Sequence, residues 1–102
     1  MLCGVLFLAI IENQHLALAY GDSGTGQPVV LLHSTGFDGS QWRGVGQVLA
    51  GEFRVLAPDL PGYGESRMRD GGMGLAHDIA ALALLLRHCG QPAHLVGHSY
   101  GG

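Results

Sequence analysis

The sequence predicts an α/β domain with a largely parallel sheet and helices on both faces. Apolar runs rich in β-formers alternate with segments of helical period along the chain, and this alternation is typical of parallel strands joined by crossover helices. Two of these runs, residues 29–32 and 54–57, are short and largely apolar, as in strands buried on both faces. The 18 glycines fall mostly at the expected turns. At 102 residues the chain is at most one domain, residues 1–102.

The first two strands are expected to form an antiparallel hairpin at the edge of the sheet. Residues 5–11 are rich in β-formers, and residues 15–20 alternate between two faces. Residues 12–14 between them supply a three-residue turn. Leu16, Leu18 and Tyr20 are expected on one face of the second strand, and Ala17 and Ala19 on the other.

The apolar start has a second interpretation as the core of a signal peptide. Residues 2–11 are mostly apolar, and residues 17–19 offer a small-x-small site. No Lys or Arg precedes the apolar run, however, and residues 12–15 interrupt it with polar groups. The strand is therefore favoured. No run is long enough to span a bilayer, so no membrane partner is expected.

The first helix is expected to follow the strand of residues 29–32. Residues 22–28 form a loop before that strand. Ser40 is the predicted N-cap of a helix that runs to about Ala50, and Gly51 ends it. Its apolar face is expected to hold Trp42, Val45, Val48 and Leu49.

The second helix has the clearest period in the chain. It is expected to run from about residue 75 to residue 89, after a loop from Pro58 through Arg69. Gly90 and Pro92 end it, and residues 93–97 form the last strand. The core-facing stripe is expected to be Leu75, Ile79, Leu82, Leu86 and Cys89, with Leu84 on the far side.

Composition excludes several classes of partner and cofactor. The net charge is −3, so nucleic acid is not an expected partner, and the five arginines are read as scattered surface charges. Cys3 and Cys89 show neither a disulfide framework nor a zinc pattern, which favours a reducing, cytoplasmic location. His94 and His98 share a strand face but lie about 13 Å apart at ~3.3 Å per residue, too far for one metal ion. No metal or cofactor is therefore predicted.

The last residues of the chain carry the one chemical motif. Gly97, Ser99 and Gly101 stand in a Gly-x-Ser-x-Gly pattern directly after the apolar run of residues 93–97. A serine at such a strand-to-helix turn is held in a strained backbone conformation that exposes its hydroxyl. The flanking glycines let strand and helix approach closely. Ser99 is therefore the candidate nucleophile, whereas neighbouring His98 should point to the opposite face and pack beneath the turn.

Three segments in order make the chain resemble the N-terminal part of the α/β-hydrolase superfamily. They are residues 29–36 (Val-Val-Leu-Leu-His-Ser-Thr-Gly), residues 57–66 (Ala-Pro-Asp-Leu-Pro-Gly-Tyr-Gly-Glu-Ser) and residues 97–101. The resemblance, to the AB hydrolase-1 type, runs from about Leu16 to the end. It implies a partial α/β-hydrolase sheet: an antiparallel hairpin followed by parallel strands with crossover helices, in three αβα layers, truncated after the nucleophile strand.

The resemblance also implies roles for particular residues. Ser99 would be the nucleophile, and the backbone N–H groups of Thr35 and Tyr100 would form the oxyanion hole. The family's His-Gly pair is replaced here by His33-Ser34, and His33 is expected to order its loop through hydrogen bonds. The segment from Asp59 through Glu65 to Ser66 would be structural, turning the chain after its strand.

The triad acid and base of the family follow the nucleophile in sequence, and no residue follows Gly102 here. The expectation is a serine hydrolase acting on small-molecule ester or acyl substrates through an acyl-enzyme in the intact parent, with this chain an inactive fragment. Ser99 argues against the epoxide hydrolase and haloalkane dehalogenase branches, which use aspartate there.

Several alternatives stay open at the level of sequence. One is a non-catalytic remnant or interaction protein. The others are activities that share the scaffold: C–C hydrolase, lyase and haloperoxidase. Ending at the nucleophile strand would also leave an apolar sheet edge that favours self-association.

Overall fold

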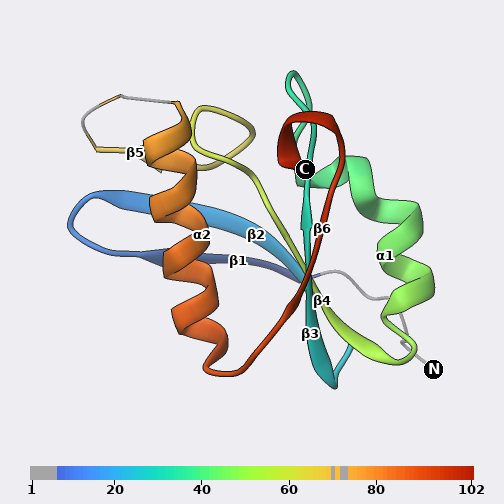
Figure 1. Cartoon of the computed structure of the whole chain (residues 1–102). Helices are drawn as coiled ribbons and strands as arrows, with labels where there is room; N and C mark the ends of the chain where they lie inside the picture. The colour runs from blue at the N-terminus through green and yellow to red at the C-terminus, as the bar shows by residue number, and fades with distance from the viewer. Residues whose placement is uncertain (1–6, 70, 72–73) are drawn as a thin grey trace.

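The computed structural model describes residues 7–69, 71 and 74–102, which form a mixed six-stranded sheet between two helical layers (Figure 1). Strands β3, β4 and β6 are parallel, β2 pairs antiparallel with β4, and β1 pairs antiparallel with β2, in the order β1-β2-β4-β3-β6. A short strand, β5, pairs with β2 outside this path. The predicted α/β class is confirmed. The elements are β1 (Phe7–Glu12), β2 (Leu16–Ser23), β3 (Gln27–Leu32), the 3₁₀ helix η1 (Gly39–Trp42), α1 (Arg43–Leu49), β4 (Phe53–Pro58), β5 (Arg67–Met68), α2 (Leu75–Cys89), β6 (His94–Gly97) and the 3₁₀ helix η2 (Ser99–Gly101).

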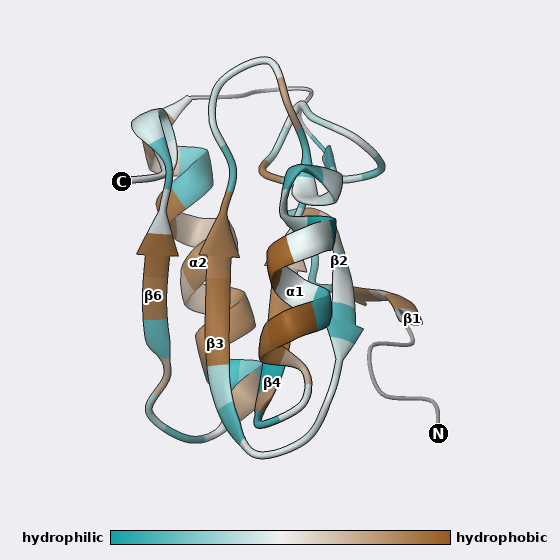
Figure 2. Ribbon diagram, turned by 90° about the vertical axis from the view of Figure 1, so that its right-hand side faces the viewer, coloured by the Kyte–Doolittle hydropathy of each residue, from teal (hydrophilic) through white to brown (hydrophobic). Residues whose placement is uncertain are grey.

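The strand order explains why the two helices lie on opposite faces. The connection from β3 to β4 through α1 moves one way across the sheet, and the connection from β4 to β6 through α2 moves back past β3. Both crossovers join parallel strands, which are almost always linked with the same right hand, so the reversal carries the helices to different faces. Figure 2 shows α1 in front of the sheet and α2 behind it. In open α/β sheets, the carboxyl ends of strands at such a reversal form the usual ligand crevice.

The core is divided between the two faces of the sheet. The α2 face is the larger, and it includes the predicted side of β2 (Leu16, Leu18 and Tyr20). Figure 2 shows apolar residues, in brown, along most of β3. Strand β3 is buried on both sides, as expected for a parallel strand with a helix on each face. The α2 face holds Leu16, Leu18, Tyr20, Val30, Leu32, Leu56, Leu60, Ala81 and Leu85, and the α1 face holds Val29, Leu31, Ala50 and Val55.

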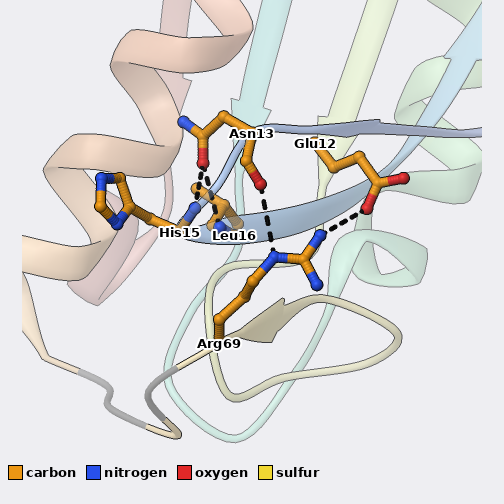
Figure 3. A network of polar contacts seen from close by, with 5 residues as sticks. All are labelled: Glu12, Asn13, His15, Leu16 and Arg69. Carbon is orange, nitrogen blue, oxygen red and sulfur yellow. Dashed lines mark hydrogen bonds and ion pairs between the residues drawn. The ribbon is translucent and has the colours of Figure 1, made fainter.

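The N-terminal hairpin is confirmed over the residues described. Its three-residue turn lies one residue later than predicted, at residues 13–15. Figure 3 shows the reason: Asn13 Oδ1 accepts from the backbone N–H of His15 (2.8 Å) and of Leu16 (3.0 Å). Arg69 anchors the turn from outside through Glu12 Oε2 (2.9 Å) and the Asn13 carbonyl oxygen (3.4 Å). Predicted strand residues 5 and 6, and Cys3, lie outside the described residues.

The predicted cap of the first helix is wrong. Asp38 is the N-cap of η1, accepting from the Ser40 backbone N–H at 2.9 Å and from the Ser40 hydroxyl at 2.6 Å. The predicted apolar face of this helix is confirmed for only two of its four residues. Trp42 and Leu49 pack against the core, whereas Val45 and Val48 are exposed. The helix meets the sheet through Gly46, where an added Cβ would lie 3.6 Å from Val55 Cγ1.

Helix α2 has the predicted bounds, and its predicted stripe is only partly confirmed. Leu82, Leu86 and Cys89 pack against the core as expected, but Leu75 and Ile79 are exposed. The buried positions are Asp78, Ala81 and Leu85. Leu84, expected on the far side, packs against the core. Ala81 and Leu85 are buried in one cluster with residues of β2, β3 and β4, so packing on the strands, and not the run of leucines, decides which face is covered.

Three further expectations were revised. The loop of residues 22–28 is shorter, because β2 continues to Ser23 by pairing with β4. Arg54, expected as a free surface charge, forms a half-buried ion pair with Asp22 at 2.8 Å. Strand β5 lies inside the predicted loop after Pro58. Among the described residues, no helix is long and apolar enough to cross a membrane.

Strand β6 is the exposed edge that the sequence predicted. In the described chain it pairs only with β3, and its residues are all exposed, with Leu95 and Val96 at 53% and 41%. An apolar edge strand with free backbone groups favours pairing with another chain. Whether the protein self-associates through it stays a prediction.

Candidate active site

Ser99 lies at a sharp turn between β6 and η2. Its φ is +56°, and it is the one non-glycine residue with positive φ in the described part of the chain. Such a conformation costs a non-glycine residue roughly 1–2 kcal/mol, so the surrounding structure must impose it. Ser99 is exposed, and none of the described residues makes a hydrogen bond to its hydroxyl. A strained, accessible serine is the geometry that the motif predicted.

The two glycines of the motif are required by close backbone contacts. A Cβ on Gly97 would collide with the Gly101 carbonyl, and a Cβ on Gly101 would collide with the Leu32 carbonyl. The same Leu32 oxygen accepts from the His98 backbone N–H at 3.1 Å. The turn is therefore pressed against the end of β3, with no room for a side chain at either position.

The loop after β3 is ordered by His33, as predicted. The ring is fully buried; its Nδ1 lies 2.8 Å from the Ser34 carbonyl oxygen, and its Nε2 lies 3.0 Å from the Leu60 backbone nitrogen. An amide N–H only donates, so Nε2 accepts and Nδ1 carries the proton. Both ring nitrogens are occupied, and His33 is not available as a general base.

Ser34 and Thr35 follow His33 and differ in environment. Ser34 is buried, and its backbone N–H and hydroxyl both donate to Gln41 Oε1, at 2.9 and 3.3 Å. Thr35 is exposed, and its backbone N–H makes no hydrogen bond to any other described residue. This loop and the turn after β6 lie at the same end of the sheet (Figure 2). The pairing of Thr35 and Tyr100 as an oxyanion hole stays a prediction.

His98 was expected to pack beneath the turn, and this expectation is wrong. The residue is exposed, and its Nδ1 lies 2.6 Å from Gln41 Nε2. The ring is thus engaged with η1 and is not hydrogen-bonded to Ser99. Gln41 was missed by sequence reasoning, because a lone glutamine on a short helix carries no pattern and its partner lies 57 residues away.

Tyr100 is hydrogen-bonded to helix α2, on the other face of the sheet from α1. Its hydroxyl donates to Asp78 Oδ2 at 2.5 Å, and this hydrogen bond is the main reason why the pKa of Tyr100 is raised above its ordinary value of 10.0. Asp78 is 9% exposed, and its other oxygen, Oδ1, has no hydrogen-bond partner among the described residues. The sequence offered one signal for Asp78, because it is an acidic residue within a mostly apolar predicted helix.

The segment after β4 is structural, as predicted. Asp59 Oδ1 accepts from the Gly39 backbone N–H at 2.7 Å, and Oδ2 accepts from the Glu65 backbone N–H at 2.9 Å. The buried Ser66 hydroxyl donates to the Asp59 carbonyl oxygen at 2.5 Å and accepts from the Ala19 backbone N–H at 2.9 Å. The polar side chains of this loop are consumed in holding the backbone.

Other candidate features lie away from Ser99. A mostly apolar cavity of about 570 Å³ opens on the α1 face between the hairpin and α1, and no residue of β6 or η2 lines it. Among the described residues, no cluster of three or more histidine, cysteine or acidic side chains could hold a metal ion. Cys89 is a free thiol whose pKa is raised by burial.

Comparison with known proteins places this geometry in context. A sequence profile described as "Alpha/beta hydrolase family" matches residues 29–102. Pimeloyl-[acyl-carrier protein] methyl ester esterase of Aeromonas salmonicida is 40% identical over 80 residues, which cover 78% of this chain and 30% of that protein. Soluble epoxide hydrolase of Corynebacterium sp. is 36% identical over 84 residues, covering 81% and 29%.

The fold comparison agrees. A solved structure of a candidate epoxide hydrolase from Pseudomonas aeruginosa superposes with a TM-score of 0.81 at 27% identity, covering 94% of this chain and 34% of that one. The chain thus spans about a third of the length of the relatives that it matches.

Proposed function

Because the chain belongs to the alpha/beta hydrolase family, we propose that it carries the nucleophile of a serine hydrolase that cleaves esters through an acyl-enzyme. The observation that carries this proposal is the backbone of Ser99, held at φ +56° with its side chain exposed at the carboxyl end of β6. Strained backbone is concentrated at functional sites, so a strained serine at a strand end supports a functional role for Ser99.

In the proposed reaction, Ser99 Oγ attacks the acyl carbon of the ester and its proton passes to a general base. The acyl C–O bond then breaks as the base returns the proton to the departing alcohol, which leaves the acyl group on Ser99. Water attacks this acyl-enzyme by the same route and releases the acid. The backbone N–H groups of Thr35 and Tyr100 stabilise the negative charge on the carbonyl oxygen in both steps.

The base and its orienting acid are expected outside these 102 residues. In the family order the acid and the histidine follow the nucleophile. The two histidines nearest the site in sequence support this proposal, since His33 is occupied by Ser34 and Leu60 and His98 is bonded to Gln41. The described chain thus offers Ser99 a stabilised turn and no hydrogen-bonded base.

An ester is the favoured substrate class. The Aeromonas salmonicida relative, at 40% identity, is named a methyl ester esterase. The Corynebacterium relative is named an epoxide hydrolase, but that branch uses an aspartate nucleophile, and this chain has Ser99 at the corresponding place. A hydroxyl nucleophile suits acyl transfer, so ester hydrolysis is the better match.

The test is covalent labelling with a fluorophosphonate probe, followed by mass mapping of the modified peptide. We compare the 102-residue chain with a chimera in which residues 1–102 replace the matching segment of the Aeromonas salmonicida esterase. Labelling at Ser99 is expected in both, faster in the chimera by at least about 10³-fold, because removal of triad members costs on the order of 10⁴ or more. Ser99→Ala should abolish it.

A folded chimera whose Ser99 stays unlabelled would contradict the hydrolase proposal. That result would favour the second candidate, a non-catalytic interaction protein. Labelling without ester turnover would instead direct the assay to C–C bond substrates, lyase substrates and haloperoxidase conditions, which the same scaffold can serve.

A further inference from the structure

We propose that Gln41 is a positioning residue that holds the loop after β3 and the turn before Ser99 at a fixed separation. The inference rests on the proposed function, because the two segments it joins carry Thr35 and Tyr100, the proposed oxyanion donors. The hydrogen-bond partners of Gln41 in the described chain are Ser34 and His98, and not Ser99. Its two amide ends contact Ser34, one residue before Thr35, and His98, one residue before Ser99.

The orientation of the Gln41 amide follows from its partners. The Ser34 backbone N–H is a donor only, so the atom that faces it at 2.9 Å must be the carbonyl oxygen Oε1. The NH₂ group is then the atom 2.6 Å from His98 Nδ1. Because NH₂ only donates, His98 Nδ1 accepts and the ring proton lies on Nε2. The contacts thus predict one amide orientation and one His98 tautomer.

The anchor beneath Gln41 is rigid. Helix η1 begins at Gly39, whose backbone N–H donates to the carboxylate of Asp59 at 2.7 Å, and Asp38 caps it through Ser40. The loop between β3 and η1 closes on itself, since the Phe37 backbone N–H donates to the Ser34 carbonyl oxygen at 3.2 Å. Motion of the Gln41 side chain relative to Ser34 is therefore restricted by its own backbone.

The segment held at the other end has less support. Strand β6 is an exposed edge that pairs with β3 alone among the described strands. Among the described residues, the hydrogen bonds from residues 98–102 to the rest of the fold are the His98 N–H bond to Leu32, the Gln41–His98 bond and the Tyr100–Asp78 bond. Gln41 is the side chain that links the Thr35 loop directly to this turn.

Such a link should matter more for reaction than for folding. The Gln41–His98 contact is exposed, and hydrogen bonds in water contribute only about 1 kcal/mol net. A displacement of about 1 Å at a reacting centre, in contrast, can cost ~10²-fold in rate. Two oxyanion donors carried on separate loops depend directly on the separation of those loops.

The test compares three variants of the 102-residue chain. Gln41→Met keeps the length of the side chain and removes both hydrogen-bonding ends. Gln41→Glu keeps an acceptor for Ser34 but replaces the donor to His98. Gln47→Met, on the exposed side of α1, is the matched control. Hydrogen exchange of the Ser34 amide and the ¹⁵N signals of the His98 ring report the link. Fluorophosphonate labelling of Ser99 gives a maximal rate and a half-saturating probe concentration.

With Gln41→Met, we expect Ser34 exchange to accelerate about tenfold and the His98 ring to lose its single tautomer. The maximal labelling rate should fall roughly 10- to 100-fold, with the half-saturating concentration unchanged. With Gln41→Glu, Ser34 should stay protected while the proton of His98 moves to Nδ1 to donate to the carboxylate. Gln47→Met should match the unsubstituted protein in every measurement.

The inference is overturned if Gln41→Met leaves Ser34 exchange and the His98 signals unchanged, or slows labelling no more than Gln47→Met. A Ser99 that does not react in the unsubstituted protein or in the chimera would defeat the proposed function separately. In that case the exchange and tautomer measurements alone decide whether Gln41 joins the two loops.

Discussion

Two glycine-containing turns at the carboxyl end of the sheet use their polar side chains in opposite ways. In the turn after β4, residues 59–66, both oxygens of the Asp59 carboxylate accept backbone N–H groups, and the buried Ser66 hydroxyl is bonded on both sides. In the turn after β6, residues 97–102, Ser99 is exposed and strained, and no described residue bonds its hydroxyl.

The difference separates polar residues that build a fold from those available for chemistry. Both turns bring a glycine into contact too close for a Cβ: Gly64 against the Asp59 carboxylate, and Gly101 against the Leu32 carbonyl. Glycine alone therefore does not distinguish them. The two turns differ in whether the polar side chain is hydrogen-bonded to the backbone. The Asp59 carboxylate is, and the Ser99 hydroxyl is not hydrogen-bonded to any described residue.

The largest expected effect is at the glycines themselves. Gly101→Ala should destabilise the protein by about 3 kcal/mol or more, since the new Cβ meets backbone atoms that cannot move independently. Gly36→Ala is the control: its φ is +84° but nothing lies within 4 Å, so the conformational cost of roughly 1–2 kcal/mol stands alone. Urea denaturation measures both. Equal costs would mean that crowding at Gly101 is relieved by local movement.

The next effect tests the structural turn. Asp59→Ala should cost about 3 kcal/mol, because it leaves the Gly39 and Glu65 backbone N–H groups without their charged acceptor. Glu65→Ala, in the same turn and exposed, should change the free energy of unfolding by less than about 0.5 kcal/mol. If Asp59→Ala proved as mild as Glu65→Ala, the contrast between the two turns would be lost.

A smaller effect, of defined sign, tests the strain at Ser99. Ser99→Gly should be more stable than Ser99→Ala by about 1 kcal/mol, because glycine adopts φ +56° without steric cost. At Ser40, within η1, the order should reverse, with the glycine variant less stable by roughly 1 kcal/mol. Chemical denaturation of the four variants checks both signs. If Ser99→Ala were as stable as Ser99→Gly, or more stable, the backbone at Ser99 would not be strained.

The smallest effect concerns Asp38, which holds η1 and with it Gln41. Asp38→Ala should cost about 1 kcal/mol at neutral pH through the lost cap. Two hydrogen bonds from Ser40 hold the pKa of Asp38 below its ordinary value of 3.8. The bond from the hydroxyl has the larger effect, and the bond from the backbone N–H the smaller. The contribution of Asp38 is therefore complete above pH 3.8 and is lost as pH falls through the lower folded-state pKa.

Denaturation at stepped pH measures this dependence. The stability difference between the unsubstituted protein and Asp38→Ala should shrink below pH 3.8. Asp38→Asn can cap the helix without a titrating charge. The difference in free energy of unfolding between Asp38→Asn and Asp38→Ala should therefore stay constant through this pH range. A gap between wild type and Asp38→Ala that stays constant into acid would contradict the role of the ionised carboxylate.

Local pattern was sufficient where a signal repeats along the chain. The period of residues 75–89 and the glycine after it predicted the bounds of α2, and alternation in residues 15–20 predicted that Leu16, Leu18 and Tyr20 share one face of β2. Local pattern failed where two residues were both suitable as the N-cap of one helix. Asp38 and Ser40 are both good caps, and only the path of the loop from β3 decided that Asp38 accepts the bonds.

The sequence by itself determined the class of fold, the order of its strands and helices apart from β5, and Ser99 as the residue at the motif's turn, because these depend on neighbours within a few residues. Only the tertiary structure decided which side of α2 is buried, that Gln41 meets His98 and that Asp78 meets Tyr100. Those contacts join residues 57 and 22 positions apart. No periodicity encodes such distances, since they arise when crossover connections bring separate strand ends to one edge of the sheet.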